Sequence, residues 1–151
     1  MKNQKNIFFY FLLILLSSSL IHSQSIEVHN FIGKSRSVVI KKYGNPIHQD
    51  NSNPVMMCMF FKSKTGSMIF VSDKKGIYQA EATKSYDTQK DARSDLDSFI
   101  SNSVTNGFAV DTVSTNDFEL HRKGTKVDLQ LSENKIAKNF EIRVKANRTE
   151  S

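Results

Sequence analysis

Cysteine, tryptophan and the common catalytic motifs are scarce or missing in this chain. Cys58 is its single cysteine, so no disulfide can form within the chain and the fold must rest on its apolar core. Tryptophan is absent, whereas 11 phenylalanines suit a compact β-rich core. The sequence contains no HExxH, GxSxG or CxxC motif and no glycine-rich phosphate loop. We therefore predict no catalytic residue, no cofactor and no bound metal.

Long apolar runs and basic clusters are equally rare. After residue 23 no segment approaches the roughly 20 apolar residues that a membrane-spanning helix needs. The formal charge of +6 comes from 21 lysines and arginines against 15 acidic residues. The basic residues fall in scattered pairs such as Lys41–Lys42 and Lys74–Lys75, with no basic stripe and no interleaved aromatics. This pattern argues against a nucleic-acid partner.

The first 23 residues have the pattern of a secretory signal peptide. Two lysines precede an apolar run, Ile7–Leu16, and the mostly small or polar residues that follow end at a plausible cleavage point. We place cleavage between Ser23 and Gln24, with Ser19 as an alternative position. An uncleaved membrane anchor is the other interpretation, but the serines at 17–19 interrupt the apolar run well short of a membrane span. The pattern predicts export to the periplasm or to the outside of the cell.

Removal of residues 1–23 leaves residues 24–151, which is the length of one ordinary domain. It also takes away two lysines and no acidic residue, so the formal charge falls from +6 to +4. We predict a single domain over residues 24–146, followed by a polar tail over residues 147–151.

A short helix is predicted within residues 33–46, GKSRSVVIKKYGNP. Ser35 is a suitable N-cap, because its hydroxyl can accept a hydrogen bond from an amide of the first turn. Gly44 can take the left-handed conformation that ends a helix, and Pro46 prevents the helix from resuming. Two helical turns are not stable alone in water, so this helix must pack on the rest of the domain. Its apolar residues share one face: Val39, Ile40 and Tyr43.

The same stretch resembles the first-helix motif of the SmpA/OmlA type of outer-membrane assembly lipoprotein, whose wider fold group includes the β-lactamase inhibitor protein. That motif has Gly-x-Ser/Thr, then a valine, a large apolar residue and Gly-x-Pro. The resemblance implies a fold of that group and carries over no functional residue. No lipobox cysteine follows the leader. The matching residues are Gly33, Ser35, Val39, Tyr43, Gly44 and Pro46.

Residues 88–106 predict one long amphipathic helix. Asp87 or Thr88 can cap its N-terminus, and Thr88 with Asp91 three residues later resembles a capping box. Gly107 is suited to end the helix. Apolar residues recur at helical spacing and form one stripe: Ala92, Leu96, Phe99, Ile100 and Val104.

Seven further segments have the alternating or continuously apolar pattern of β-strands. The strand-to-strand connections are short, which favours an antiparallel meander. Residues 55–62 are apolar on both faces, so we predict a central strand that is covered on both sides. Residues 24–30 predict a lead-in strand or a loose terminus, and residues 47–54 an exposed loop. The seven predicted strands are 55–62, 67–72, 77–86, 108–114, 118–122, 125–131 and 139–144.

The predicted fold class is α+β, with two helices packed on one face of an antiparallel meander sheet of about seven strands. The predicted order is α-βββ-α-ββββ. This pattern allows either one continuous sheet or two αβ layers set side by side. No residue-level repeat relates the two halves of the chain.

Cys58 and its methionine neighbours raise two chemical hypotheses. A thiol nucleophile would need a histidine base such as His29, His48 or His121, but a thiol within the most apolar strand behaves as a small hydrophobe. A Cu(I) site would need the sulfur atoms to converge, whereas successive side chains along a strand point to opposite faces. We therefore interpret the group as core residues: Met56, Met57, Cys58 and Met59.

A loose acidic group with one histidine surrounds the predicted hairpin at 118–131. Glu119 and His121 share one strand face with Asp117, as a metal site or an acid–base site would require. The same alternation also produces an ordinary solvated face on the far side of the strand from its apolar residues. We interpret the group as a solvated face and assign no site residue to it. The group comprises Asp111, Asp117, Glu119 and His121.

The sequence favours an exported, non-enzymatic interaction module that binds an unidentified envelope or extracellular protein. Its binding surface would be the exposed sheet face or the loop 47–54, since uncovered sheets and loops are where partners bind. One alternative is a small hydrolase or metal-binding protein that uses the Glu119/His121 sheet face. A second alternative is a small-ligand carrier with a cavity between helix 88–106 and the sheet.

Overall fold

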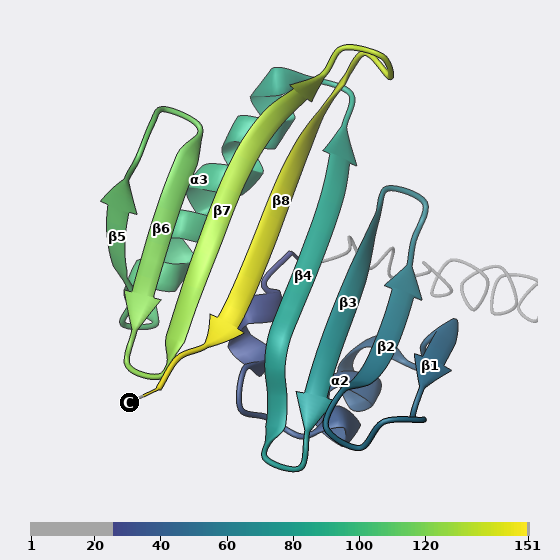
Figure 1. Cartoon of the computed structure of the whole chain (residues 1–151). Coiled ribbons are helices and arrows are strands. Elements are labelled where there is room, and N and C mark those ends of the chain that lie inside the picture. Colours follow the sequence, from purple (N-terminus) through teal and green to yellow (C-terminus); the bar gives the residue numbers. More distant parts are fainter. Residues whose placement is uncertain (1–25, 151) are drawn as a thin grey trace, which may run out of the picture.

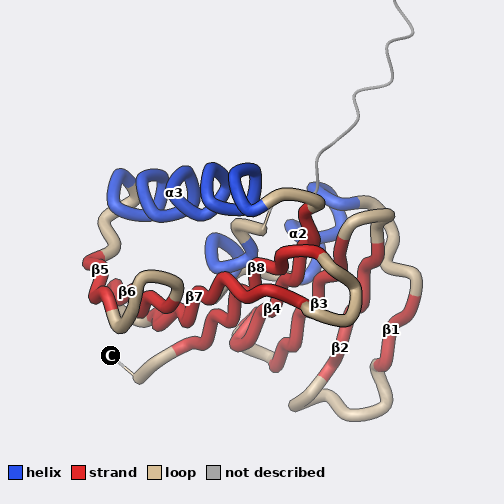
Figure 2. Tube along the Cα trace, turned by 90° about the horizontal axis from the view of Figure 1, so that it is seen from above, coloured by secondary structure: helices blue, strands red, loops and turns tan. Residues whose placement is uncertain are grey.

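An antiparallel sheet of eight strands is the framework of the computed structural model, which describes residues 26–150. The predicted signal peptide and its cleavage position lie outside these residues. One 3-10 helix, η1, and two α-helices, α2 and α3, lie on one face of the sheet (Figure 1, Figure 2). The elements are η1 (Val28–Phe31), α2 (Arg36–Tyr43), β1 (His48–Asp50), β2 (Met57–Lys62), β3 (Gly66–Asp73), β4 (Gly76–Tyr86), α3 (Gln89–Thr105), β5 (Ala109–Thr112), β6 (Asp117–Arg122), β7 (Thr125–Asn134) and β8 (Asn139–Arg148).

The strand order is β1-β2-β3-β4-β8-β7-β6-β5, and all neighbouring strands are antiparallel. Each half of the chain therefore contributes a helix followed by a four-stranded meander. The last strands of the two halves, β4 and β8, meet at the centre through eight residue pairs, from Gln79↔Asn147 to Tyr86↔Phe140. Of the two arrangements that the sequence allowed, the structure has the single continuous sheet (Figure 1).

The α+β class is confirmed, but the sheet has eight strands rather than about seven. The additional strand, β1, lies within the segment 47–54 that was predicted to be a loop. Its three residues pair with β2, from His48↔Phe60 to Asp50↔Cys58, so the observed order is α-ββββ-α-ββββ. All three are exposed and polar and carry no strand pattern of their own, so pairing with β2 defines this strand.

Both ends of the domain also differ from the prediction. Residues 28–31 form a 3-10 helix instead of a lead-in strand, and the side chains of Val28, His29 and Phe31 are buried. At the other end β8 continues to Arg148. Asn147 and Arg148, which the sequence placed in a polar tail, are therefore the last residues of a central strand.

The hydrophobic core lies between the sheet and the helices. The predicted stripe of α3 is confirmed for Ala92, Leu96 and Phe99, which are buried, whereas Val104 is 53% exposed. Thr88 caps the helix as predicted, because its Oγ1 accepts a hydrogen bond from the backbone N–H of Asp91 at 3.1 Å. One row of paired residues on the helix-covered face is buried across six strands: Met59, Phe70, Ala80, Ala146, Val127 and Leu120.

An aromatic cluster attaches α2 to β2 and β3. The ring of Tyr43 lies 6.0 Å, between centroids, from both Phe61 and Phe70. This packing agrees with the predicted apolar face of the helix. The expected side-chain cap is wrong: Ser35 is the N-cap residue, but its hydroxyl contacts the Ser37 hydroxyl at 2.8 Å and accepts no amide of the first turn.

β2 is not the doubly covered central strand that its apolar sequence suggested. It is the second strand from the edge, and its buried side chains, Met59 and Phe61, face the helices. Cys58 and Phe60 point to the other face of the sheet and are only partly buried. The strand is apolar on both faces because one face packs against the helices and the other carries apolar side chains that are partly exposed.

Candidate functional site

The face of the sheet opposite the helices, the open face, is not covered by any helix of residues 26–150 (Figure 2). Its side chains come from the strand positions that alternate with the core positions. One row of paired residues crosses all eight strands, and it is apolar on β2 and β3 and ionic from β4 to β5. The row is His48, Phe60, Ile69, Glu81, Lys145, Asp128, Glu119 and Asp111.

The apolar part of the open face, the apolar patch, comprises Cys58, Phe60, Ile69 and Val71. Phe60 pairs with Ile69 and Cys58 with Val71 in the ladder between β2 and β3. Ile69 is 37% exposed, Cys58 and Phe60 are partly exposed, and Val71 is 9% exposed. The neighbouring strands β4 and β8 carry polar and charged side chains on this face. A contiguous apolar patch rimmed by polar residues is typical of a surface that another molecule covers.

Exposed apolar side chains continue at the edge of the sheet. Ile47, Val55 and Met56 are each more than half exposed and flank β1 and β2. The turn between these strands is fixed, because the carboxylate of Asp50 accepts hydrogen bonds from the amide and the hydroxyl of Ser52. Those hydrogen bonds hold the pKa of Asp50 below its usual value. The segment predicted as a binding loop is thus a short strand and an ordered turn beside the apolar patch.

The ionic part of the open face is a chain of opposite charges across β5, β6 and β7. His121 Nε2 lies 3.5 Å from Asp111 Oδ2 and 3.5 Å from Glu119 Oε2. Lys126 Nζ lies 3.2 Å from Glu119 Oε1 and 3.5 Å from Asp128 Oδ1. The carboxylate of Glu119 raises the pKa of Lys126. Lys126 pairs with two of the three carboxylates in this group, and such exposed pairs add little to stability.

The register places Glu119, His121 and Asp117 on one face of β6, as the sequence predicted. The carboxylate of Asp117, the first residue of β6, is already occupied: its Oδ2 accepts from the Ser114 hydroxyl at 2.6 Å and its Oδ1 from the Gln130 amide at 2.7 Å. Among the residues that the structure describes, no three His, Cys, Asp or Glu side chains are arranged to hold a metal ion. The geometry of this group is that of an ion-pair network.

Cys58 is not the buried core residue that its apolar strand suggested. Its side chain is partly exposed on the open face, with Sγ 3.9 Å from the carbonyl oxygen of Met56. Met59 is fully buried on the helix side, where Met57 Sδ also accepts a hydrogen bond from Arg36 at 3.4 Å. The sulfur atoms are therefore divided between the two faces, as the alternation predicted, and within residues 26–150 no histidine hydrogen-bonds the thiol.

A polar hollow of about 430 Å³ lies where the end of β4 meets the first half of α3. Asp95 Oδ2 accepts hydrogen bonds from Lys84 Nζ and from the Tyr86 hydroxyl, each at 2.7 Å. Burial and the Asp95 carboxylate raise the pKa of Tyr86, so its hydroxyl keeps its proton and acts as a donor. Sequence reasoning missed this cluster, whose signal was a lysine at a helix-facing position of β4. The hydrogen bonds of Asp95 therefore join α3 to β4, and we call this contact the clamp. A hollow with so polar a lining does not suit a lipid ligand.

Replacing Asp95 by alanine should lower the free energy of unfolding by about 1–2 kcal/mol, because two donors lose their shared acceptor and one of them is a charged group. Urea unfolding followed by circular dichroism measures the change. The control is Asp97→Ala at an exposed position of the same helix, which should change stability by less than about 0.5 kcal/mol. Equal effects of the two substitutions would contradict the clamp.

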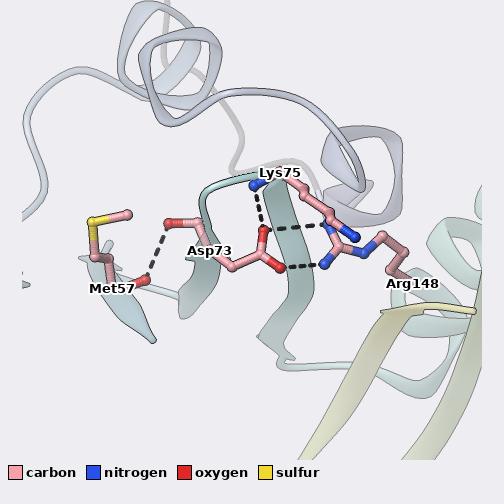
Figure 3. A network of polar contacts seen from close by, with 5 residues as sticks. Met57, Asp73, Lys75 and Arg148 are labelled. Carbon is pink, nitrogen blue, oxygen red and sulfur yellow. Dashed lines mark hydrogen bonds and ion pairs between the residues drawn. The ribbon is translucent and has the colours of Figure 1, made fainter. Parts of the chain in front are cut away.

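A second hollow, the Arg148 hollow, has a volume of about 870 Å³ and lies at the other end of β4. Both terminal nitrogens of Arg148 donate to the carboxylate of Asp73, and the backbone N–H of Lys75 donates to Asp73 Oδ1 at 2.7 Å (Figure 3). The hydrogen bond from Arg148 holds the pKa of Asp73 below its usual value. Sequence reasoning missed this hollow because it placed Arg148 in a tail.

The fold and these surfaces define a small α+β protein with one helix-covered and one open sheet face. Within residues 26–150, no helix is both long and apolar enough to cross a membrane. No protein-family model, no curated protein and no solved structure matches the chain. The resemblance of residues 33–46 to an assembly-lipoprotein helix therefore stays a prediction.

Proposed function

We propose that this protein is an exported, non-enzymatic interaction module that binds another protein through its open face. The observation that carries the proposal is the apolar patch on the face of the sheet that no helix of residues 26–150 covers, where Ile69 is 37% exposed and Phe60 is partly exposed. The signal-peptide pattern of residues 1–23 supports a place in the periplasm or outside the cell. The ion pair between Lys145 and Glu81, 3.6 Å apart on the strands next to the patch, supports a binding surface with a polar rim.

The open face is large enough for a stable interface. Strands lie about 4.8 Å apart and rise about 3.3 Å per residue, so eight strands that average about seven residues present roughly 900 Å². A standard protein–protein interface buries about 800 Å² on each partner. A few apolar anchors surrounded by polar residues usually carry most of the binding energy. Phe60 and Ile69 have that position here, with Glu81 and Lys145 beside them.

Capture experiments with the predicted mature chain, residues 24–151, test this proposal. Immobilised protein should retain one abundant protein from an envelope extract of the native organism, identified by mass spectrometry after washing at raised salt. Ile69→Lys should weaken that retention at least about tenfold, because a charge replaces an apolar anchor. Val104→Lys is the matched control, since Val104 is an exposed apolar residue on the helix layer.

Two results would contradict the proposal. If the material retained by the protein matches that on an inactive bait, the interaction module loses its support. If Ile69→Lys and Val104→Lys retain the partner equally well, the partner binds elsewhere than on the open face. Circular dichroism of both variants shows that each is folded before the comparison is made.

A further inference from the structure

The Arg148 hollow is built from four separate segments of the chain. Its lining includes Gly33 before α2, Val55 before β2, Lys75 and Tyr78 around the start of β4, and Arg148 at the end of β8. Its volume of about 870 Å³ falls in the size range of small-ligand pockets. The hollow adjoins the edge of the proposed protein-binding surface, since Val55 lies in both, but its charged residues are not part of the apolar patch.

Backbone hydrogen bonds hold the walls of the hollow in place. The N–H of Gly33 donates to the carbonyl of Ile77 at 2.7 Å, and the N–H of Ile77 donates to the carbonyl of Lys34 at 2.9 Å. At the opposite wall the N–H of Thr149 donates to the carbonyl of Gly124 at 3.2 Å. A site whose walls are fixed in advance binds a ligand without a large ordering cost.

A β-bulge places Tyr78 in the hollow. The register between β3 and β4 shifts from Val71↔Gln79 to Ser72↔Ile77, which leaves Tyr78 as the unpaired extra residue. Bulges of this kind redirect a side chain and are frequent next to binding sites. The Tyr78 ring lies 5.8 Å, at its centroid, from the guanidinium carbon of Arg148. The ring and Val55 supply apolar surface within a charged lining.

Some charged side chains of the lining are paired with each other and others are not. Arg148 and Asp73 are paired with each other, as Figure 3 shows. Lys75 and Glu150 also line the hollow; both are exposed, and neither side chain makes a hydrogen bond or ion pair with another residue of 26–150. The side chain of Lys75 extends toward Arg148 in Figure 3. The described lining therefore holds one unpaired cation and one unpaired anion beside an aromatic ring.

We infer that the Arg148 hollow binds a small zwitterion of the amino-acid class that has an apolar side chain. The carboxylate of the ligand pairs with Lys75, its ammonium group pairs with Glu150, and its side chain packs on Tyr78 and Val55. A simple anion or a simple cation satisfies only one of the two unpaired charges. A zwitterion satisfies both, and it leaves the ion pair between Asp73 and Arg148 intact.

Three probes that share a phenyl ring test the inference on the isotope-labelled mature chain, residues 24–151, by nuclear magnetic resonance. L-phenylalanine carries both charges, phenylpropionate only the carboxylate, and phenylethylamine only the ammonium group. L-phenylalanine should give saturable shifts of the amides of Lys75, Tyr78 and Thr149. Each single-charge probe should bind about tenfold more weakly, the change in affinity that corresponds to one lost charge contact.

Matched variants show whether the named charges are responsible. Lys75→Met should weaken L-phenylalanine about tenfold and abolish its advantage over phenylethylamine, and Glu150→Gln should abolish its advantage over phenylpropionate. Lys74→Met in the same turn is the control and should leave all three affinities unchanged, because Lys74 does not line the hollow. Equal affinities for the three probes, no saturation below roughly 10 mM, or an equal loss in Lys74→Met would overturn the inference.

Discussion

Gly76→Ala should lower the free energy of unfolding by roughly 2–5 kcal/mol, a large share of the 5–15 kcal/mol that stabilises a typical domain. Gly76 has φ of +110°, which L-residues with a side chain rarely adopt. A Cβ at this position would lie 2.8 Å from the carbonyl oxygens of both Gly33 and Lys34. These are backbone atoms, so the loop before α2 would have to move away and lose its two hydrogen bonds with Ile77.

Urea unfolding of the variant measures this loss, and Gly124→Ala provides the control. Gly124 also has positive φ, +78°, but a Cβ there would meet no atom within 4 Å. Its replacement should therefore cost only the conformational strain, about 1 kcal/mol. If Gly76→Ala is no more destabilising than Gly124→Ala, the close approach between the β3–β4 turn and the loop before α2 is not as tight as described.

The elements that bury one face and expose the other were predictable from the sequence. In β7 the side chains of Val127, Leu129 and Leu131 are buried while those between them are not, so a period of two residues identified the strand. In α3 the spacing of Leu96 and Phe99 identified the buried side in the same way. These patterns are visible in the sequence because each of the two elements packs against a single layer, so that one side is buried and the other is exposed.

β1 and η1 were not predictable: β1 has no periodic pattern, and the alternation of Ile26 and Val28 with polar neighbours favoured a strand where η1 begins. The three residues of β1 are polar and exposed, and their pairing with β2 is the reason that they form a strand. The four residues of η1 fill space between α3 and the sheet, with a histidine at a position of 1% exposure. A short segment with mixed polarity contains no information about which distant residues will surround it.

The candidate sites were predictable only in part. Period-two alternation correctly placed Glu119 and His121 on one face. The apolar patch was visible as the continuous apolar run of β2, but a run does not distinguish a face covered by the same chain from a face left for a partner. The Arg148 hollow joins four separate segments, and no local pattern relates Asp73 to Arg148.

His29 is the buried group on which the stability of the protein at mildly acidic pH should depend. Its ring lies 4.6 Å from the ring of Phe99 and 5.2 Å from that of Phe108, between centroids. Its Nε2 is 3.3 Å from the Ser103 hydroxyl, and Nδ1 is buried without a hydrogen-bond partner among the described residues. Burial, followed by the nearby charge of Arg122, lowers the pKa of His29 to about 4.

The pH dependence follows from this lowered pKa. The folded protein keeps His29 neutral down to about pH 4, whereas the unfolded chain takes up a proton near the ordinary pKa of 6.5. The contribution of neutral His29 is therefore fully present above pH 6.5 and is lost as the pH falls toward 4. The difference in pKa corresponds to roughly 3 kcal/mol of unfolding free energy. Urea unfolding at a series of pH values between 7.5 and 4 should show this fall.

His29→Gln separates this effect from that of the carboxylates. Asp73, Asp95 and Asp117 have pKa values below their usual range, so protonation of these groups destabilises the folded protein at lower pH than His29 does. The variant should be less stable than the parent at neutral pH and should lose most of the slope between pH 6.5 and 5, where His29 dominates. His48→Gln on the exposed edge strand should keep the parent slope. A parent-like slope in His29→Gln would mean that the imidazole is protonated within the folded protein, and that the aromatic enclosure by Phe99 and Phe108 opens to admit it.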